Sequence, residues 1–107
     1  MMDESNTHVI MRSPAAVTVR NTVEFARELR ETCEENPEVV LDLGELAEAD
    51  LSFVQLVHAA RVHLDRAGGS LRLASPAAGP VAALLIRAGF SSHPDDVDFW
   101  FHGVLPQ

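Results

Sequence analysis

The residues best suited to chemistry are four carboxylates in a short stretch of the chain, Asp42, Glu45, Glu48 and Asp50. Carboxylate oxygens are the ligands that Mg²⁺ prefers, and these side chains could gather at one edge of a sheet. A phosphoacceptor site of this kind normally also uses a lysine to sense the phosphoryl group, and the chain contains no lysine. The acidic stretch therefore does not predict phosphoryl transfer.

The histidines and the single cysteine lack the spacing of metal ligands. His58 and His63 are five positions apart, which places them about 140° apart around a helix. The other soft ligands stand alone in the sequence: His8, Cys33, His93 and His102. The chain also lacks a Gly-x-Ser-x-Gly elbow, a P-loop and a dinucleotide-binding glycine pattern. We therefore expect no metal, no cofactor and no enzymatic activity.

Length and charge narrow the class of partner. A chain of 107 residues is the size of one domain. Its formal net charge is −8, and all eight basic residues are arginines scattered from Arg12 to Arg87. Nucleic-acid binding requires clustered basic residues, and the acidity would also repel anionic lipid headgroups. We expect neither nucleic acid nor a membrane surface as partner.

The N-terminus and the cysteine content indicate the compartment. One cysteine cannot form an internal disulfide, which fits a reducing environment. Residues 1–8 are polar and acidic, the opposite of a signal peptide, and no apolar run approaches the roughly 20 residues that cross a bilayer. We expect a cytoplasmic protein with a flexible tail over residues 1–8 and one domain over residues 9–107.

Short apolar runs predict the strands. β-branched or apolar residues favour strands at residues 8–11, 17–19, 39–43 and 70–74. The run 39–43 is nearly continuous, which is typical of a central strand covered on both faces. The aromatic residues 99–101 are interpreted as a last strand or as an arm that covers the core.

Three helices are predicted between these strands. The first begins after Asn21, with Glu24 completing a capping box, and the second begins near Ser52. The third begins either at Ser75-Pro76 or at Pro80. Helices between strands imply parallel crossovers and a sheet with helices packed on it.

The second helix carries one clear apolar face, formed by Phe53, Leu56, Val57, Ala60 and Leu64. Leu51 and Val54 fall outside this stripe. If both are exposed they form a small apolar patch beside Asp50, a feature that suits docking. The alternative is that Leu51 packs inward from the preceding loop.

Four segments carry a resemblance to a known family. They read VVLDL at 39–43, EADLSFVQLV at 48–57, RAGGSLRLASP at 66–76 and LLIRAGF at 84–90. In this order and at this spacing the chain resembles the STAS family, the fold of the anti-sigma-factor antagonists. The resemblance implies an α/β fold, a single STAS-type domain with a mixed β-sheet and with helices packed mainly on one face.

The resemblance also implies a function. STAS domains are binding modules, and in bacterial partner-switching circuits such a protein binds a GHKL-type serine kinase that acts as an anti-sigma factor. The kinase phosphorylates the Ser or Thr immediately after an aspartate at a helix start. The alternative within the family is the STAS scaffold subunit of an ABC-type phospholipid transport complex, whose partner is the transporter ATPase. A homodimer is left open.

The site implied by the resemblance is the start of the second helix, and this sequence departs from the family pattern there. The expected partner-binding residues are Asp50, Leu51, Ser52, Val54, Gln55 and His58. Asp50 matches the family aspartate and could be a helix cap, a solvated loop acid or a partner contact. The next residue, Leu51, has no hydroxyl. Ser52 is shifted by one position. It fits either a helix cap paired with Gln55 or a site of phosphorylation.

Overall fold

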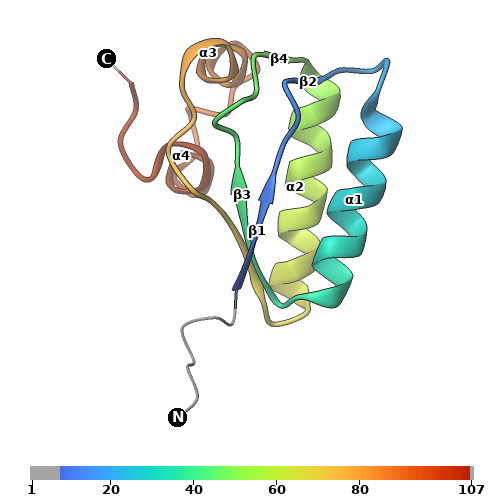
Figure 1. Ribbon diagram of the computed structural model, residues 1–107. Helices are drawn as coiled ribbons and strands as arrows, with labels where there is room; N and C mark the ends of the chain where they lie inside the picture. Colours follow the sequence, from blue (N-terminus) through green and yellow to red (C-terminus); the bar gives the residue numbers. More distant parts are fainter. Residues whose placement is uncertain (1–7, 107) are drawn as a thin grey trace.

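The structure is a computed structural model that describes residues 8–106 (Figure 1). The elements run in the order β1 (His8–Arg12), β2 (Ala16–Val17), α1 (Thr22–Glu35), β3 (Glu38–Asp42), β4 (Glu48–Ala49), α2 (Leu51–Arg66), β5 (Ser70–Leu73), α3 (Gly79–Arg87) and α4 (Pro94–Phe101). Of the predicted tail, residues 1–7 lie outside the described residues, and His8 is the first residue of β1.

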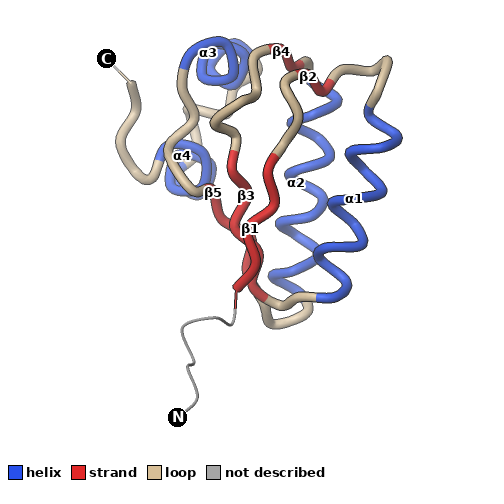
Figure 2. Tube along the Cα trace, viewed as in Figure 1, coloured by secondary structure: helices blue, strands red, loops and turns tan. Residues whose placement is uncertain are grey.

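The strands form two small parallel sheets. The larger has the order β1-β3-β5 and the smaller pairs β2 with β4. The mixed sheet expected from the sequence differs in this detail, since every strand pair among residues 8–106 is parallel. Successive strands of the larger sheet are joined through a strand of the smaller sheet and a helix, β2 and α1 between β1 and β3 and β4 and α2 between β3 and β5 (Figure 2). Such crossover connections are what parallel pairing requires.

The main core lies between the larger sheet and the helices α1 and α2, which cover one side of it (Figure 1). The register places Val9, Val39 and Leu71 in one row across the sheet and Met11, Leu41 and Leu73 in another. Alternate residues of a strand share a face, and both rows belong to the hydrophobic core or pack against it. From the helices, the core takes Phe25, Leu29, Cys33, Phe53, Val54, Val57 and Leu64.

The C-terminal aromatic residues form a helix, so the predicted last strand or arm at residues 99–101 is wrong. His93 precedes α4, Pro94 occupies its first turn, and Asp95 and Asp96 follow. Proline at the first helical position and carboxylates near a helix N-terminus favour a helix, and these signals outweigh the strand preference of the aromatic residues. The helix buries Phe99, Trp100 and Phe101, and it packs beside β5 and against α2.

The predicted capping box at Asn21, at the start of α1, is not formed. Asn21 immediately precedes the helix, but its side chain makes no capping hydrogen bond to the first turn. Its Oδ1 accepts the Thr18 amide at 2.8 Å, and its Nδ2 donates to the Ala16 carbonyl at 2.8 Å. Asn21 therefore closes the turn between β2 and α1. For α3, the later of the two predicted starts holds, since the helix begins at Gly79 with Pro80 in its first turn.

Candidate functional site

The start of α2 is held by the carboxylate of Asp50, which is the N-cap residue. Asp50 Oδ1 accepts the Ser52 amide at 3.0 Å and also accepts a hydrogen bond from the Ser52 hydroxyl. Its other oxygen, Oδ2, accepts the Val19 amide at 3.0 Å. One side chain therefore satisfies an otherwise unpaired helix amide and connects α2 to the segment that precedes α1.

This arrangement differs from the predicted capping box. Ser52 lies inside the first turn of α2, one residue beyond Leu51, and Asp50 takes the capping position in its place. The Ser52 hydroxyl is a donor to Asp50 and not the acceptor for a helix amide. Both residues fit a cap by type, and Asp50 occupies it because its backbone is extended just before the helix begins.

The same hydrogen bonds keep Asp50 ionised. The bond from the Ser52 hydroxyl, followed by that from the Val19 amide, lowers the pKa of the Asp50 carboxyl from its usual value. Donors that point at a carboxylate favour its charged form. A fixed negative charge therefore stands at the end of α2 that carries the positive pole of the helix dipole.

Three of the predicted partner-binding residues form an exposed row on α2. Leu51, Gln55 and His58 are spaced four and three positions apart, which puts them on one face of a helix, and all three are exposed. Leu51 is 45% exposed, so it does not pack inward from the loop. Ser52 is half-buried beside this row.

Val54 does not belong to this surface, and its predicted exposure is wrong. Its side chain is 0% exposed and lies in the core with Phe53 and Val57. The helix packs against both β5 and α1, so its buried face is wider than the single stripe read from the sequence. Val54 fills the additional part of that face.

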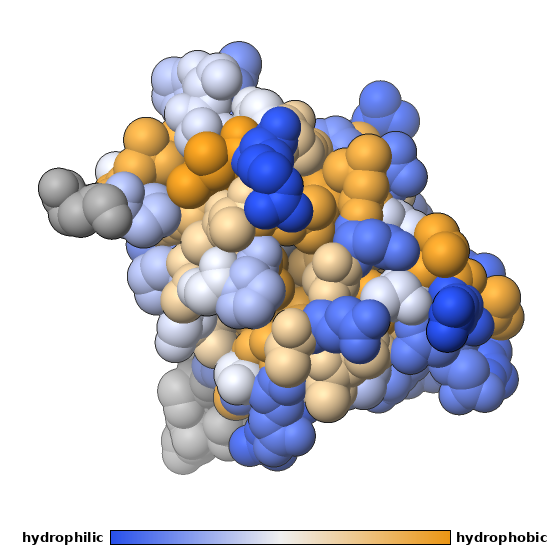
Figure 3. All heavy atoms as spheres, turned by 90° about the horizontal axis from the view of Figure 1, so that it is seen from above, coloured by the Kyte–Doolittle hydropathy of each residue, from blue (hydrophilic) through white to orange (hydrophobic). Residues whose placement is uncertain are grey.

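Two exposed valines were missed by the sequence analysis. Val19 is 73% exposed and Val23 is 78% exposed. Residues 17–19 were interpreted as a strand, whereas β2 ends at Val17 and Val19 lies in the turn before α1. The starts of α1 and α2 lie at the same end of the molecule (Figure 1), and hydrophobic side chains reach the surface there when it is seen from above (Figure 3).

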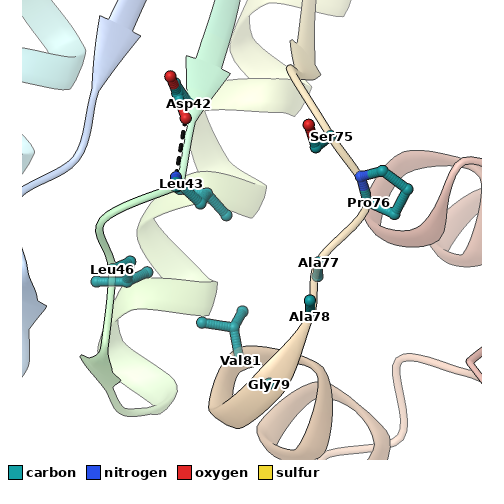
Figure 4. Close-up of a pocket in the computed structure, with 10 residues that line it drawn as sticks. Asp42, Leu43, Leu46, Ser75, Pro76, Ala77, Ala78, Gly79 and Val81 are labelled. Carbon is teal, nitrogen blue, oxygen red and sulfur yellow. Dashed lines mark hydrogen bonds between the residues drawn. The ribbon is translucent and has the colours of Figure 1, made fainter.

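A hollow of about 340 Å³ lies beside this end, where β3 and β5 finish. Asp42 is its one charged lining residue, and Leu46 and Val81 point toward one another across it (Figure 4). Asp42 Oδ1 already accepts the Gly44 amide at 2.8 Å, and its Oδ2 lies 3.6 Å from Arg12 Nε. The hollow therefore presents mostly small apolar side chains and a carboxylate engaged within the chain.

The remaining chemical candidates are the possible metal ligands and the single cysteine. Within residues 8–106, no group of three or more His, Cys, Asp or Glu side chains could hold a metal ion. Cys33 is buried, and desolvation raises the pKa of its thiol. None of the helices in the described part of the chain is long and apolar enough to cross a membrane.

Fold and site together define a small α/β domain that presents a rigidly capped helix start. The family model described as "Mlab, STAS domain" matches residues 3–95. The chain therefore belongs to the STAS domain family, which confirms both the family and the α/β fold class predicted from the sequence. A search of the curated proteins found no match, and a search of the solved structures found none either.

Proposed function

We propose that this chain is a non-catalytic protein-interaction domain that acts as an anti-sigma-factor-antagonist-like regulator in a bacterial partner-switching or signalling pathway. The proposed partner is a GHKL-type serine kinase that serves as anti-sigma factor. The observation that carries this proposal is the exposed row Leu51, Gln55 and His58 beside the ionised Asp50 cap. A large apolar side chain held exposed on a rigid helix start can dock without a cost in chain ordering.

The proposal places the protein in the cytoplasm, where such kinases and sigma factors act. It assigns no nucleic acid and no membrane lipid as direct partner, because the chain carries a net charge of −8. Self-association into a homodimer is compatible with the same surface and competes with the partner for Leu51.

Ser52 is the hydroxyl that a partner kinase would meet at this helix start. Its phosphorylation would add about −1.5 to −2 charges beside the Asp50 carboxylate, whose hydrogen bond from the Ser52 hydroxyl would be lost. The added charge would repel Asp50 and weaken docking. The intact mass of protein isolated from its host with phosphatase inhibitors tests this point. A mass without an added phosphate would contradict phosphorylation of Ser52.

A second function has support at the same position. A STAS scaffold subunit of an ABC-type phospholipid transport complex would bind the transporter ATPase without being phosphorylated. Leu51 has no hydroxyl at the position after the aspartate, and the Ser52 hydroxyl is already engaged by Asp50. Both features favour a surface that binds constantly over one that is switched.

The experiment that tests the proposal measures binding to two purified candidates from the same host, a GHKL-type kinase and a transporter ATPase, by titration calorimetry. The variant Leu51→Asp should abolish binding to the true partner. The matched control is Ile86→Asp on α3, since Ile86 and Leu51 are each 45% exposed. Binding to neither protein would refute both proposed partners, and equal loss in both variants would refute docking through the α2 start.

A further inference from the structure

The Asp50 carboxylate joins two segments that are distant in the sequence. Its bond to the Val19 amide spans 31 positions of the chain, and its bonds to Ser52 fix the first turn of α2. The Asp50 side chain therefore links Val19 directly to the first turn of α2, in addition to the pairing of Val17 with Ala49 between β2 and β4. A displacement of either segment would break one of these hydrogen bonds.

The two segments are also where exposed apolar side chains concentrate. The exposed large hydrophobic residues of the described chain are Ile10, Val19, Val23, Leu51, Ile86, Val104 and Leu105. Val19 adjoins Asp50 through its amide, Leu51 follows Asp50 directly, and Val23 lies in the first turn of α1. Single exposed apolar residues are ordinary, but a group of them at one rigid end indicates an interaction surface.

Charge indicates the kind of partner. Residues 42–50, which precede α2, contain four carboxylates and no basic residue. Of these four carboxylates, that of Asp42 forms an ion pair with Arg12. On the other segment, Arg20 is the only basic residue between β2 and α1. An acidic surround and a chain charge of −8 favour a partner of opposite charge.

We propose that Val19, Val23 and Leu51 form one docking surface, held in register by Asp50, for a protein that presents apolar side chains surrounded by lysine or arginine. This rests on the proposed function, because Leu51 belongs to both. It extends the contact beyond α2 to the turn before α1 and to the first turn of α1.

Site-specific photo-crosslinking in the host tests this surface with the full chain. The probe is the photoreactive amino acid p-benzoylphenylalanine, placed in turn at positions 19, 23 and 51. Position 104 is the matched control, since Val104 and Val19 are each 73% exposed. Probes at positions 19, 23 and 51 should cross-link to the same protein, and the probe at position 104 should not cross-link to it.

The charge part of the proposal is tested in lysate. Raising the salt from about 0.1 M to about 1 M shortens the screening length from roughly 10 Å to roughly 3 Å. The yield of the adduct at position 23 should fall accordingly. A yield that does not change with salt would overturn the basic character of the partner.

The remaining outcomes separate this inference from the proposed function. An adduct at position 51 alone would overturn the extended surface and leave docking through α2 intact. An adduct between two copies of this chain would replace the basic partner with a homodimer. No adduct at positions 19, 23 and 51 would overturn both the extended surface and docking through the start of α2.

Discussion

The apolar residues at the start of α2 and those of α4 show two different ways of handling hydrophobic side chains outside the main core. Phe99, Trp100 and Phe101 are all buried, although they belong to the last helix of the chain. Leu51 and Val23 lie in the first turns of two longer helices and are exposed. Other parts of the chain cover the aromatic side chains of α4, whereas the apolar side chains at the starts of α1 and α2 remain exposed.

The difference follows from what lies next to each group. Trp100 packs edge-on against Phe99, with ring centroids 4.9 Å apart, and contacts Phe53 of α2 at 6.2 Å. Arg61 of α2 lies 4.8 Å over the Phe99 ring and pairs with Asp96 of α4 at 3.4 Å. The start of α2 has a hydrogen-bonded frame but no such cover within residues 8–106. Of these two groups, the one at the starts of α1 and α2 stays exposed, and it is this group that the proposed partner would cover.

The largest expected difference in stability is between substitutions at two residues of α2, the buried Val54 and the exposed Leu51. Val54→Asp should lower the free energy of unfolding by several kcal/mol, because burying even a neutral polar group costs roughly 2–7 kcal/mol, a large part of a domain stability of about 5–15 kcal/mol. Leu51→Asp should change the free energy of unfolding by only about 0.5 kcal/mol, since an acidic residue suits the first turn of a helix. Urea unfolding measures both, and equal destabilisation would contradict the division between core and surface.

A smaller effect is expected where α2 meets α4. Arg61→Ala removes the guanidinium from the Phe99 ring and from Asp96, and should destabilise the domain by about 1–2 kcal/mol. Trp100 fluorescence during urea unfolding reports the loss, because this residue is a fully buried part of α4. Arg66→Ala, at an exposed position of the same helix, is the control. If the two variants unfold at the same urea concentration, Arg61 does not secure α4.

The fold could be predicted from the sequence where one physical signal dominated. The continuous apolar run at residues 39–43 corresponds to the central strand β3, and Gly68 ends α2 with a φ of 86°, a backbone conformation that glycine adopts at little cost. The prediction of a strand or arm at residues 99–101 was wrong because aromatic residues suit strands, whereas the preceding Pro94 and its neighbouring acidic residues start a helix. These helix-start signals are local, and giving them more weight than the aromatic residues would have predicted α4.

The start of α2 could be predicted from the sequence, whereas the role of its residues in partner binding stays a prediction. Asp50 and Leu51 lie at that helix start, and the family aspartate was the signal for it. Val54 was misplaced because a helix that packs against both a sheet and another helix buries more than one stripe. Val19 was missed because its bond to Asp50 crosses 31 positions, and no periodic pattern reports such a contact.

The smallest predicted effect concerns the Asp50 carboxylate itself. Because its pKa is lowered in the folded protein, its charge stabilises the fold above the unfolded pKa of about 3.9. That contribution is lost as the pH falls through the lower folded value. Asp50→Asn keeps a capping side chain but has no charge to lose. The stability difference between the two proteins should therefore shrink below about pH 4 in urea unfolding, and parallel curves would show that the ionised form contributes nothing.

Amide hydrogen exchange tests the role of the same carboxylate at individual backbone amides. In Asp50→Ala the Val19 amide loses its acceptor and should exchange faster, because only a hydrogen bond to that side chain protects it at the surface. The Thr18 amide is the internal control, since it donates to Asn21 Oδ1 at 2.8 Å and does not depend on Asp50. Acceleration at Val19 alone would identify Asp50 as the connection between the two segments. Equal acceleration at both amides would mean that the whole turn before α1 loosens without the carboxylate, so that Asp50 holds more than the Val19 amide. No acceleration at Val19 would show that the turn is held by packing against α2 and not by the carboxylate.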